Sequence, residues 1–431
     1  MEKKQKIAFI TLGCKLNFSE TSTIARQFPE SGYERVSPLK VADIYVVNTC
    51  AVTLASERKC RQAIRRVAKL NPGARVVVTG CYAQLRPHEI TDLCKDIKGL
   101  TILMDKSLFY TPRTTLEEAG PDNYCRPAPN SFFPAFSSGD RTRSFLKVQD
   151  GCNYHCTYCT VPLARGDSRN AAIKKLVETA NAIARQGIRE IVLTGVNIGD
   201  FGRSTGETFF DLLKALHEVD GIARYRISSI EPNLLTGEMI QWIARSSKIL
   251  PHFHIPLQSG NNKILERMKR RYTRELFAQR VDAIRQAMPQ AFIGVDVIAG
   301  FPGETPEDFE DSRRFLEQLA PAFLHVFPYS ARPDTPAATF NDQVAEQEKT
   351  RRAEVLGMLS SALLRKFYER HTGIDEQALF EDANKGGKMF GYTRNYIKVE
   401  TPYNPALAGR VIDVHTTGIS ESGHMAVLVK S

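Results

Sequence analysis

The sequence predicts a mixed α/β protein with three successive domains. Short apolar runs alternate with helical patterns in residues 1–120, and a second series of such units fills residues 141–370. Residues 371–431 instead hold short alternating runs without long helical segments. These three patterns predict, in order, a doubly wound parallel sheet, a partial (β/α) barrel and a small antiparallel β-barrel.

The first domain is predicted from three apolar runs, "KIAFITLG", "ADIYVVNTC" and "ARVVVTGC". Each run is short, rich in β-branched residues and closed by Gly or Cys, which is typical of strands buried on both faces of a parallel sheet. The chain then loses its periodicity and becomes rich in Pro and Ser. Residues 121–140 are therefore expected to form a linker.

The second domain is predicted from "RSFLKVQDGC" and five later strand-like runs. Helical segments such as "IKKLVETANAIARQ" separate the runs "IREIVLTG", "RYRISSIEP", "HFHIPLQS", "FIGVDVIAG" and "FLHVFPYS". Repeated β-then-α units of this length predict an open or partial barrel, with its chemistry at the C-terminal ends of the strands. The first of these strands ends at a loop that contains three cysteines.

The third domain follows a long charged segment, residues 347–372, which is expected to be one helix. After it come the short runs "QALFED", "YIKVET", "GRVIDVHTTG" and "HMAVLVK". Alternating runs of this kind predict a small antiparallel barrel.

Composition and charge narrow the class of protein. No apolar run approaches the roughly 20 residues that span a bilayer. The N-terminal stretch "KKQKIAFITLGC" has too short an apolar part for a signal segment, so a cytoplasmic location and no membrane partner are expected. The formal net charge of +10 suits a polyanionic partner such as nucleic acid, although an ordinary basic enzyme fits equally well.

Three cysteines, Cys152, Cys156 and Cys159, have the spacing C-x3-C-x2-C. Grouped cysteines in a chain without an export signal suggest a metal or catalytic site rather than disulfides. Zinc would need a fourth ligand, and His155 is awkwardly adjacent to Cys156. An iron–sulfur cube suits three thiolates and leaves one iron open.

A second group, Cys14, Cys50 and Cys81, is spread along the first domain, but each cysteine ends or follows a predicted parallel strand. The carboxyl ends of such strands line one edge of a sheet, so the three thiols could converge. They could equally be small buried residues at strand ends. The other cysteines, Cys60, Cys94 and Cys125, have no spaced partner and are expected to have no functional role.

The cysteine loop after the first barrel strand, with Tyr158 before its third cysteine, resembles the radical S-adenosylmethionine (SAM) superfamily. The segments "GCKLNFSET", "NTCAVT" and "GCYAQ" resemble the three cysteine motifs of the methylthiotransferases within it. This resemblance covers essentially the whole chain. It implies a Rossmann-like methylthiotransferase domain, a TIM-like radical SAM barrel and a C-terminal TRAM β-barrel.

The resemblance implies two 4Fe–4S clusters, each with an open iron. Cys152, Cys156 and Cys159 would hold the radical SAM cluster, and the strand-end cysteines of the first domain would hold an auxiliary cluster. It also implies two molecules of SAM per turnover. One would methylate a sulfur on the auxiliary cluster, and the other would supply the 5′-deoxyadenosyl radical that removes a hydrogen from an unactivated carbon, which no general base could deprotonate.

Cofactor contacts are expected at the ends of the barrel strands. Residues 194–200 stand where the superfamily binds the methionine amino group, and residues 298–300 resemble the segment whose backbone contacts adenine. Arg332 would meet the cofactor carboxylate or a phosphate. Any of these could also be a strand end that binds nothing. The full expected set is Tyr158, Thr194, Gly195, Asn197, Ser229, Glu231, Gln258, Ile298, Gly300 and Arg332.

Details of the motifs predict the substrate. Lys15 after the first cysteine, Glu20, and the segments "SERKCRQAIRR" and "GDRTRSFLKVQDGC" resemble the threonylcarbamoyladenosine tRNA methylthiotransferases. The implied reaction is methylthiolation of carbon 2 of threonylcarbamoyladenosine at position 37, next to the anticodon. The expected partners are the anticodon stem-loop of tRNA and unidentified electron and sulfur donors.

Three alternatives stay open at this point. The same chemistry could act on isopentenyladenosine in tRNA or on a ribosomal protein aspartate. From a different class, the chain could be a non-catalytic RNA-binding protein that holds zinc.

Basic residues near aromatic ones mark candidate RNA contacts, because cations gather phosphates and rings stack on unpaired bases. Three clusters qualify: a predicted helix face, the segment "RMKRRYTR", and a patch in the otherwise nearly neutral third domain. Each could instead be a solvated charged surface. The expected RNA-binding residues are Arg58, Arg61, Arg65, Arg270, Arg271, Tyr272, Lys388 and Arg394.

Overall fold

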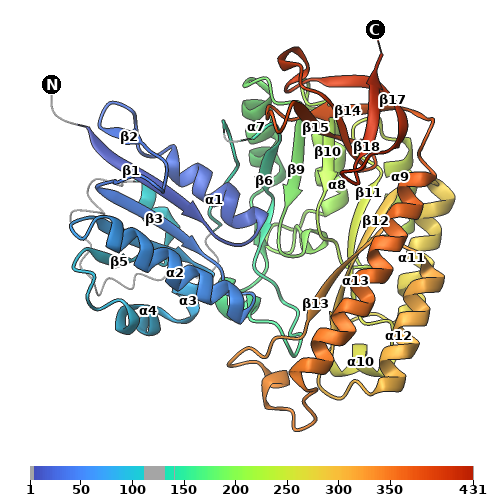
Figure 1. Ribbon diagram of the computed structural model, residues 1–431, viewed down its shortest axis with the longest axis horizontal. Coiled ribbons are helices and arrows are strands. Elements are labelled where there is room, and N and C mark those ends of the chain that lie inside the picture. Colours follow the sequence, from blue (N-terminus) through green and yellow to red (C-terminus); the bar gives the residue numbers. More distant parts are fainter. Residues whose placement is uncertain (1–3, 111–131, 140, 431) are drawn as a thin grey trace.

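The computed structural model describes residues 4–110, 132–139 and 141–430. Figure 1 shows the first domain, in blue, beside a central unit coloured green to orange, and the red third domain above the end of α13 (Glu346–Glu369). The mixed α/β fold class predicted from the sequence is confirmed. Most of the predicted linker 121–140, and Cys125 with it, lies outside the described residues.

The first domain is a five-stranded parallel sheet in the order β2-β1-β3-β4-β5. Alternate residues of its central strands enter two separate apolar cores, one on each face. Tyr45 and Val47 face the core of α2, whereas Val46 packs on the opposite face with Ile24 of α1. The elements are β1 (Gln5–Thr11), α1 (Lys15–Ala25), β2 (Tyr33–Arg35), β3 (Ile44–Thr49), α2 (Leu54–Leu70), β4 (Arg75–Gly80), α3 (Cys81–Leu85), α4 (Pro87–Leu93), β5 (Leu100–Ile102) and η1 (Lys106–Tyr110).

The central unit is a partial barrel made of two three-stranded parallel sheets, β10-β9-β6 and β11-β12-β13. Isolated bridges near β10 and β11 join the two sheets. The strands are β6 (Ser144–Lys147), β9 (Glu190–Thr194), β10 (Arg224–Ile227), β11 (His252–Gln258), β12 (Phe292–Ala299) and β13 (Phe323–Pro328), and a short pair, β7 (Gln149–Asp150) and β8 (Arg169–Asn170), follows β6.

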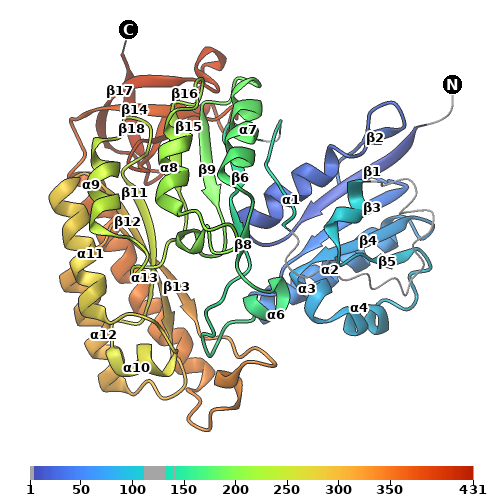
Figure 2. The same ribbon diagram turned by 180° about the vertical axis from the view of Figure 1, so that it is seen from behind.

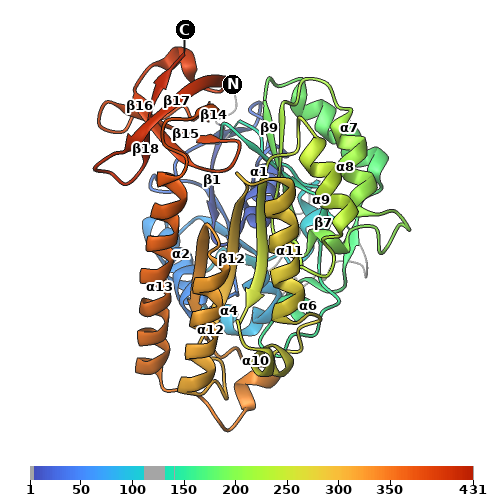
Figure 3. The ribbon, with the colours of Figure 1, turned by 90° about the vertical axis from the view of Figure 1, so that its right-hand side faces the viewer.

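Helices cover the outer face of the barrel strands, as Figures 2 and 3 show. Their amphipathic faces form the largest apolar core with the strands. Several begin at a threonine cap, and α12 starts with a full capping box between Thr305 and Asp308. The helices are α6 (Val161–Arg165), α7 (Ile173–Ala184), η2 (Ile198–Asp200), α8 (Phe209–His217), α9 (Gly237–Arg245), α10 (Asn262–Arg267), α11 (Arg274–Ala287), α12 (Pro306–Leu319) and η3 (Pro336–Thr339), followed by α13.

The third domain is a closed barrel in the order β14-β15-β16-β18-β17. The sequence predicts only four of its strands, because Gly391 interrupts the apolar pattern of the missed strand, β15. A Cβ on Gly391 would lie 2.6 Å from the carbonyl oxygen of Leu379, so close strand packing requires glycine there. The elements are β14 (Asp375–Phe380), β15 (Lys388–Thr393), β16 (Lys398–Pro402), η4 (Pro405–Leu407), β17 (Val411–Ile419) and β18 (Met425–Val429).

Among the described residues, no helix combines the length and apolar character that crossing a bilayer requires.

Candidate active site

Cys14, Cys50 and Cys81 lie at one edge of the first sheet, directly after β1, β3 and β4. These strands are parallel neighbours, and their pairing continues to the ends that carry the cysteines. Gly13 has φ +109°, and a Cβ there would lie 3.0 Å from the Sγ of Cys50. Glycine therefore lets the Cys14 loop approach Cys50 closely.

Buried polar side chains connect the three cysteine loops. The Asn17 amide donates to the carbonyl oxygens of Leu12, at 2.8 Å, and Thr49, at 2.9 Å. The Thr49 hydroxyl donates to the carbonyl oxygen of Thr79 at 2.6 Å. Leu12, Thr49 and Thr79 each precede one of the cysteines by one or two residues, so these bonds hold the three loops side by side.

The thiols of this group also influence one another's ionisation. Burial raises the pKa of Cys14, and Cys81 raises it further while Arg165 opposes the change. Burial raises the pKa of Cys50 to about 11, and Cys81 and Cys14 add to the effect. A bound cation would reverse this mutual repulsion and stabilise all three as thiolates, so the residues fit a metal cluster.

The second set, Cys152, Cys156 and Cys159, packs together in the loop after β7. Backbone N–H groups lie 3.4 Å from the sulfurs of Cys152 and Cys159, and a guanidinium nitrogen of Arg270 donates to the sulfur of Cys156 at 3.1 Å. Such donors stabilise the negative charge of metal-bound sulfur. Three soft thiol ligands with these donors fit an iron–sulfur cluster.

Burial also raises the pKa of two thiols in this loop. It raises the pKa of Cys152 to about 11 and that of Cys159 to about 12, and Cys156 raises both further. These thiols are protonated at neutral pH in the metal-free chain, so cluster binding must release protons.

Two residues expected to bind RNA, Arg270 and Tyr272, lie inside this site, where both side chains are buried and bonded to other protein groups. Arg270 is 3% exposed; it forms an ion pair with Glu231 and donates to the Tyr272 hydroxyl at 2.9 Å. Tyr272 is buried, and its hydroxyl donates to the carbonyl oxygen of Pro256. Neither side chain is free to meet a phosphate or to stack on a base.

Gln149, which the sequence analysis missed, fastens the predicted cofactor loop to the cysteine loop. Its Oε1 accepts from the backbone N–H of Val196 at 2.9 Å and of Asn197 at 3.0 Å, and its Nε2 donates to the carbonyl oxygen of Gly151 at 2.8 Å. Among the described residues, the buried side-chain amide of Asn197 has no hydrogen-bond partner. A buried amide without a partner suits a polar ligand such as the methionine part of a cofactor.

Thr194 and Gly195, also expected to contact the cofactor, both have roles in the local structure. Thr194 is buried, and its hydroxyl donates to the carbonyl oxygen of Leu146 at 3.0 Å. A Cβ on Gly195 would lie 2.7 Å from the side chain of Ile198 and 2.9 Å from that of Gln149. Glycine thus permits the tight turn, and a cofactor role for both residues stays a prediction.

Ser229, Glu231 and Gln258 lie at or just after the ends of β10 and β11. Burial raises the pKa of Glu231 even though Arg270 opposes the shift. Glu231 also acts electrostatically on Cys152, which places this carboxylate close to the cysteine loop. Gln258 has φ 71°, an uncommon value for a residue other than glycine.

Tyr158 and Ile298 belong to one apolar cluster, in which the Tyr158 ring meets the Phe301 ring edge-on at 6.4 Å. Gly300 has φ +74°, and a Cβ there would lie 2.5 Å from the side chain of Lys349. The packing of α13 therefore requires glycine at this position. Contact of these residues with a cofactor stays a prediction.

Arg332 joins the first domain to the barrel. It is buried and forms an ion pair with Glu57 of α2, while its Nε and Nη1 have no hydrogen-bond partner among the described residues. A second ion pair, between Arg86 and Asp334 at 2.6 Å, connects the same two domains. Two nitrogens of Arg332 thus remain able to meet an anionic ligand.

A second buried connection between the domains centres on Glu20 of α1. Its carboxylate lies 2.8 Å from the Lys147 ammonium and 3.1 Å from the Arg165 guanidinium, both in the barrel domain. Arg165 also contacts Asp150 at 2.9 Å and donates to the Asn17 side chain at 2.7 Å. Asn17, which connects the loops of Cys14 and Cys50, is therefore hydrogen-bonded to the barrel domain, which carries the C-x3-C-x2-C cysteines.

Known protein families match the first domain and the barrel domain, and known relatives match nearly the whole chain. Residues 146–316 match the radical SAM superfamily, and residues 6–101 match the uncharacterized protein family UPF0004. The threonylcarbamoyladenosine tRNA methylthiotransferase MtaB of Bacillus subtilis is 41% identical over 95% of this chain and 93% of its own. The chain belongs to the radical SAM methylthiotransferase family.

Other members of the methylthiotransferase family match over similar lengths. MtaB of Aquifex aeolicus is 37% identical over 92% of this chain and 96% of its own. The tRNA-2-methylthio-N(6)-dimethylallyladenosine synthase of Geobacter metallireducens is 31% identical over 96% of both chains. Membership confirms the resemblance read from the motifs and gives no support to a non-catalytic zinc protein. It also implies that SAM and a 4Fe–4S cluster are bound.

The fold agrees with solved radical SAM structures. The methyltransferase TsrM of Kitasatospora setae, solved with cobalamin and a 4Fe–4S cluster, has a TM-score of 0.57 and 15% identity over 78% of this chain and 74% of its own. At this level of identity, the likeness establishes the fold alone.

Replacing Asn17 by alanine is expected to weaken the metal site at the strand ends of this methylthiotransferase ten- to a hundredfold, because the loops of Cys14 and Cys50 lose their shared donor. Iron and sulfide analysis after anaerobic reconstitution and desalting should show about half of the iron lost, with 5′-deoxyadenosine formation retained. Asn181→Ala, which removes a surface amide bonded to the Val177 carbonyl at 3.0 Å, is the matched control. Full iron retention in the Asn17 variant would contradict this role.

A cavity of about 570 Å³ lies where the three domains of the methylthiotransferase meet, and Cys14 lines it. The side chains of Tyr392 and Tyr396, stacked at 4.8 Å, form part of the wall from the third domain. Among the described residues that line it, five are cationic and none is acidic. The cationic residues that line it are Lys15, Arg35, Arg141, Arg143 and Arg226.

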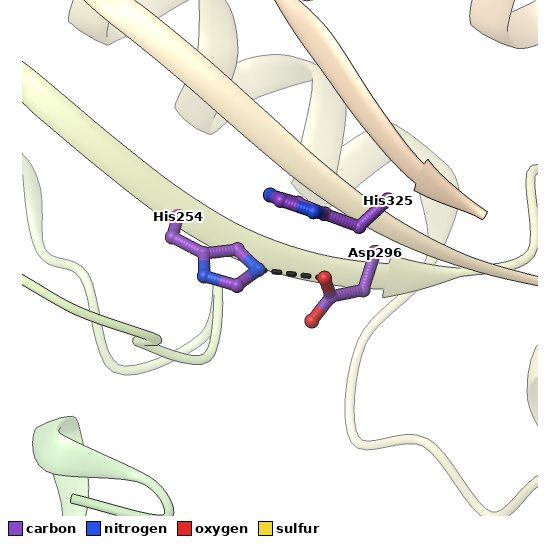
Figure 4. A group of neighbouring side chains, drawn as sticks. All are labelled: His254, Asp296 and His325. Atoms are coloured by element: carbon purple, nitrogen blue, oxygen red, sulfur yellow. Dashed lines mark hydrogen bonds and ion pairs between the residues drawn. The ribbon is translucent and has the colours of Figure 1, made fainter. Parts of the chain in front are cut away.

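His254, Asp296 and His325 lie side by side on β11, β12 and β13, as Figure 4 shows. The Nε2 of His254 lies 2.6 Å from Oδ1 of Asp296. Burial lowers the pKa of His325 to about 4, and His254 lowers it further, so His325 is neutral at pH 7. Lys15 acts electrostatically on both Asp296 and His325. Its positive charge favours a hydrogen-bonding role for the group over a divalent metal ion.

The remaining residues expected to bind RNA differ in availability. Arg58 is exposed on α2, but Arg61 forms an ion pair with Glu89 at 3.0 Å. Arg65 donates to the carbonyl oxygen of Leu93 at 3.3 Å. Arg58 is therefore the most accessible cation of the predicted face.

Arg271, Lys388 and Arg394 each contact protein groups but remain partly accessible. Arg271 is exposed and lies over the ring of Tyr154 at 4.1 Å. Lys388 pairs with Glu400 at 2.5 Å, and Arg394 donates to the Ser247 carbonyl at 3.0 Å, which attaches the third domain to the barrel. RNA binding by these residues stays a prediction.

Proposed function

We propose that this enzyme transfers a methylthio group to carbon 2 of threonylcarbamoyladenosine at position 37 of tRNA, giving 2-methylthio-threonylcarbamoyladenosine. The observation that carries the choice of nucleoside is the near full-length similarity to relatives named for that reaction. The anticodon stem-loop would be the bound part of the tRNA. A cytoplasmic location and unidentified electron and sulfur donors complete the proposal.

Two three-cysteine sites support two 4Fe–4S clusters. Cys152, Cys156 and Cys159 would hold the cluster that works with SAM, which supplies a carbon radical when it is cleaved reductively. The strand-end cysteines of the first domain would hold the auxiliary cluster, near the sulfur that is transferred. The buried connections through Glu20 and Arg332 support this arrangement, because they hold the two cysteine-bearing domains in a constant relative position.

This chain's own residues orient and shield the reaction. Arg270 holds Cys156 and Glu231 in place, and Gln149 holds the loop with the unpaired Asn197 amide. The cavity beside Cys14 would receive the modified adenosine, with aromatic side chains on its wall. A closed apolar surrounding keeps water from a reactive radical.

Mass spectrometry of nucleosides tests the choice of substrate. The enzyme, reconstituted anaerobically with iron, sulfide, a reductant and SAM, is incubated separately with RNA stem-loops that carry threonylcarbamoyladenosine or isopentenyladenosine. Methylthio product is expected on the first RNA and at most a trace on the second. Product mainly on isopentenyladenosine, or on neither RNA while 5′-deoxyadenosine still forms, would overturn the proposed substrate.

A further inference from the structure

We propose that Lys15 binds the carboxylate of the threonylcarbamoyl group and so makes the enzyme selective for an anionic substituent on the adenosine. This inference rests on the proposed function and adds a recognition residue to it. Its basis is the position of Lys15 in the cavity and the absence, within the described ranges, of an internal partner for its ammonium group.

Lys15 lines the cavity that is proposed to receive the reacting base. It follows Cys14 directly at the first position of α1, and both residues line the cavity between the three domains. The opposite walls come from the barrel, through Phe145 and Val192, and from the third domain, through Tyr392. A group that contacts Lys15 therefore lies beside a predicted ligand of the auxiliary cluster.

Two other cations of this cavity, Arg226 and Arg143, are held by bonds within the protein. Arg226 donates to Glu190 at 3.0 Å and to the carbonyl oxygens of Thr393 and Arg394. Arg143 donates to Glu381 at 3.2 Å and lies over the Tyr392 ring. These bonds attach the third domain to the barrel, so neither arginine can leave its partners without loosening that contact.

The Lys15 ammonium, in contrast, makes no hydrogen bond or ion pair with any residue that the structure describes. Asp296 acts on it electrostatically but is not within ion-pair distance. A partly enclosed ammonium without a carboxylate leaves positive charge for a ligand to neutralise.

The chemistry of the substrate matches this charge. Threonylcarbamoyladenosine carries one free carboxylate on a short side chain, whereas an isopentenyl group carries no charge. A volume of about 570 Å³ is within the range of small-ligand sites, and the aromatic rings around it suit a purine. A cavity that offers a cation without an internal partner favours the substrate that carries the carboxylate over the uncharged analogue.

Binding of short anticodon stem-loops to the full-length protein tests this role. Fluorescence anisotropy compares RNA that carries threonylcarbamoyladenosine with RNA that carries the corresponding primary amide, which has the same shape and no charge. The wild-type protein is expected to bind the carboxylate RNA at least about tenfold more tightly. Lys15→Gln should bring this ratio close to one, and Lys15→Arg should retain most of it.

The matched control is Lys174→Gln, which removes an exposed lysine on α7 and should leave the ratio unchanged. If Lys15→Gln weakens both RNAs equally, Lys15 meets a phosphate or supports the fold, and the inference is wrong. An unchanged ratio in Lys15→Gln also refutes it.

Product formation separates this inference from the proposed function. If the wild-type enzyme methylthiolates the carboxylate RNA and the amide RNA equally well, the proposed function holds but the proposed role of Lys15 is refuted. If it modifies only isopentenyladenosine RNA, the proposed function itself fails.

Discussion

Replacing Cys152, Cys156 and Cys159 together by alanine is expected to abolish 5′-deoxyadenosine formation completely. The three sulfurs are the proposed ligands of one cluster, and no other cysteine packs with them in the described residues. Cys14, Cys50 and Cys81 lie in the first domain, outside this loop, so their cluster should persist. Iron per chain should fall from roughly eight to roughly four, as measured with sulfide after anaerobic reconstitution.

Two further variants make this result specific. Cys94→Ala, which alters a buried cysteine outside both groups, should keep all of the iron and all of the activity. Triple replacement of Cys14, Cys50 and Cys81 should give the converse phenotype, with 5′-deoxyadenosine formed but no methylthio product. Radical formation that survives loss of the C-x3-C-x2-C cysteines would refute the assignment of that cluster.

Glu20→Gln is expected to destabilise the protein by about 3–5 kcal/mol, because it removes a buried negative charge that Lys106, Lys147 and Arg165 share. Glu20 is 1% exposed and lies 2.7 Å from Lys106, 2.8 Å from Lys147 and 3.1 Å from Arg165. Burial alone would raise its pKa, but Arg165, Lys106 and Lys147 hold the pKa well below the ordinary value. Anaerobic urea denaturation followed by circular dichroism measures the difference in unfolding free energy.

The pH dependence of this difference provides a second check. The folded pKa of Glu20 is lowered, so its stabilising contribution is present above the unfolded pKa of about 4.3 and is lost as the pH falls through the folded pKa. The gap between wild type and Glu20→Gln should therefore be full at pH 7 and smaller near pH 3. Glu178→Gln, which removes an exposed pair with Lys175 at 3.2 Å, should change stability by less than about 1 kcal/mol. Equal effects of the two substitutions would show that the interface network has no special role.

Local patterns in the sequence were sufficient to predict the architecture. Runs of β-branched residues predicted the six barrel strands and β1, β3 and β4 of the first sheet, but not its short strands β2 and β5. The C-x3-C-x2-C spacing located the cysteine loop after β7. Such features depend on residues within one element, because strand burial and a three-cysteine loop leave a periodic or spaced signal. The same patterns identified Cys14, Cys50 and Cys81 as strand-end residues, although not how closely they approach one another.

The partners of these residues were decided by the tertiary structure alone. Arg270 and Tyr272 lie in a basic, aromatic segment that predicted RNA binding. In the fold, Arg270 instead donates a hydrogen bond to Cys156, 114 residues earlier in the chain. Likewise, Glu20 meets Lys147 across 127 residues, and Arg332 meets Glu57 across 275. No local pattern records contacts of such separation, because they arise only when whole domains pack. The sequence by itself therefore determined the family motifs and the cysteines proposed to carry the chemistry. The packing of the three domains decided which side chains hold the site together and which, like Lys15, line the cavity.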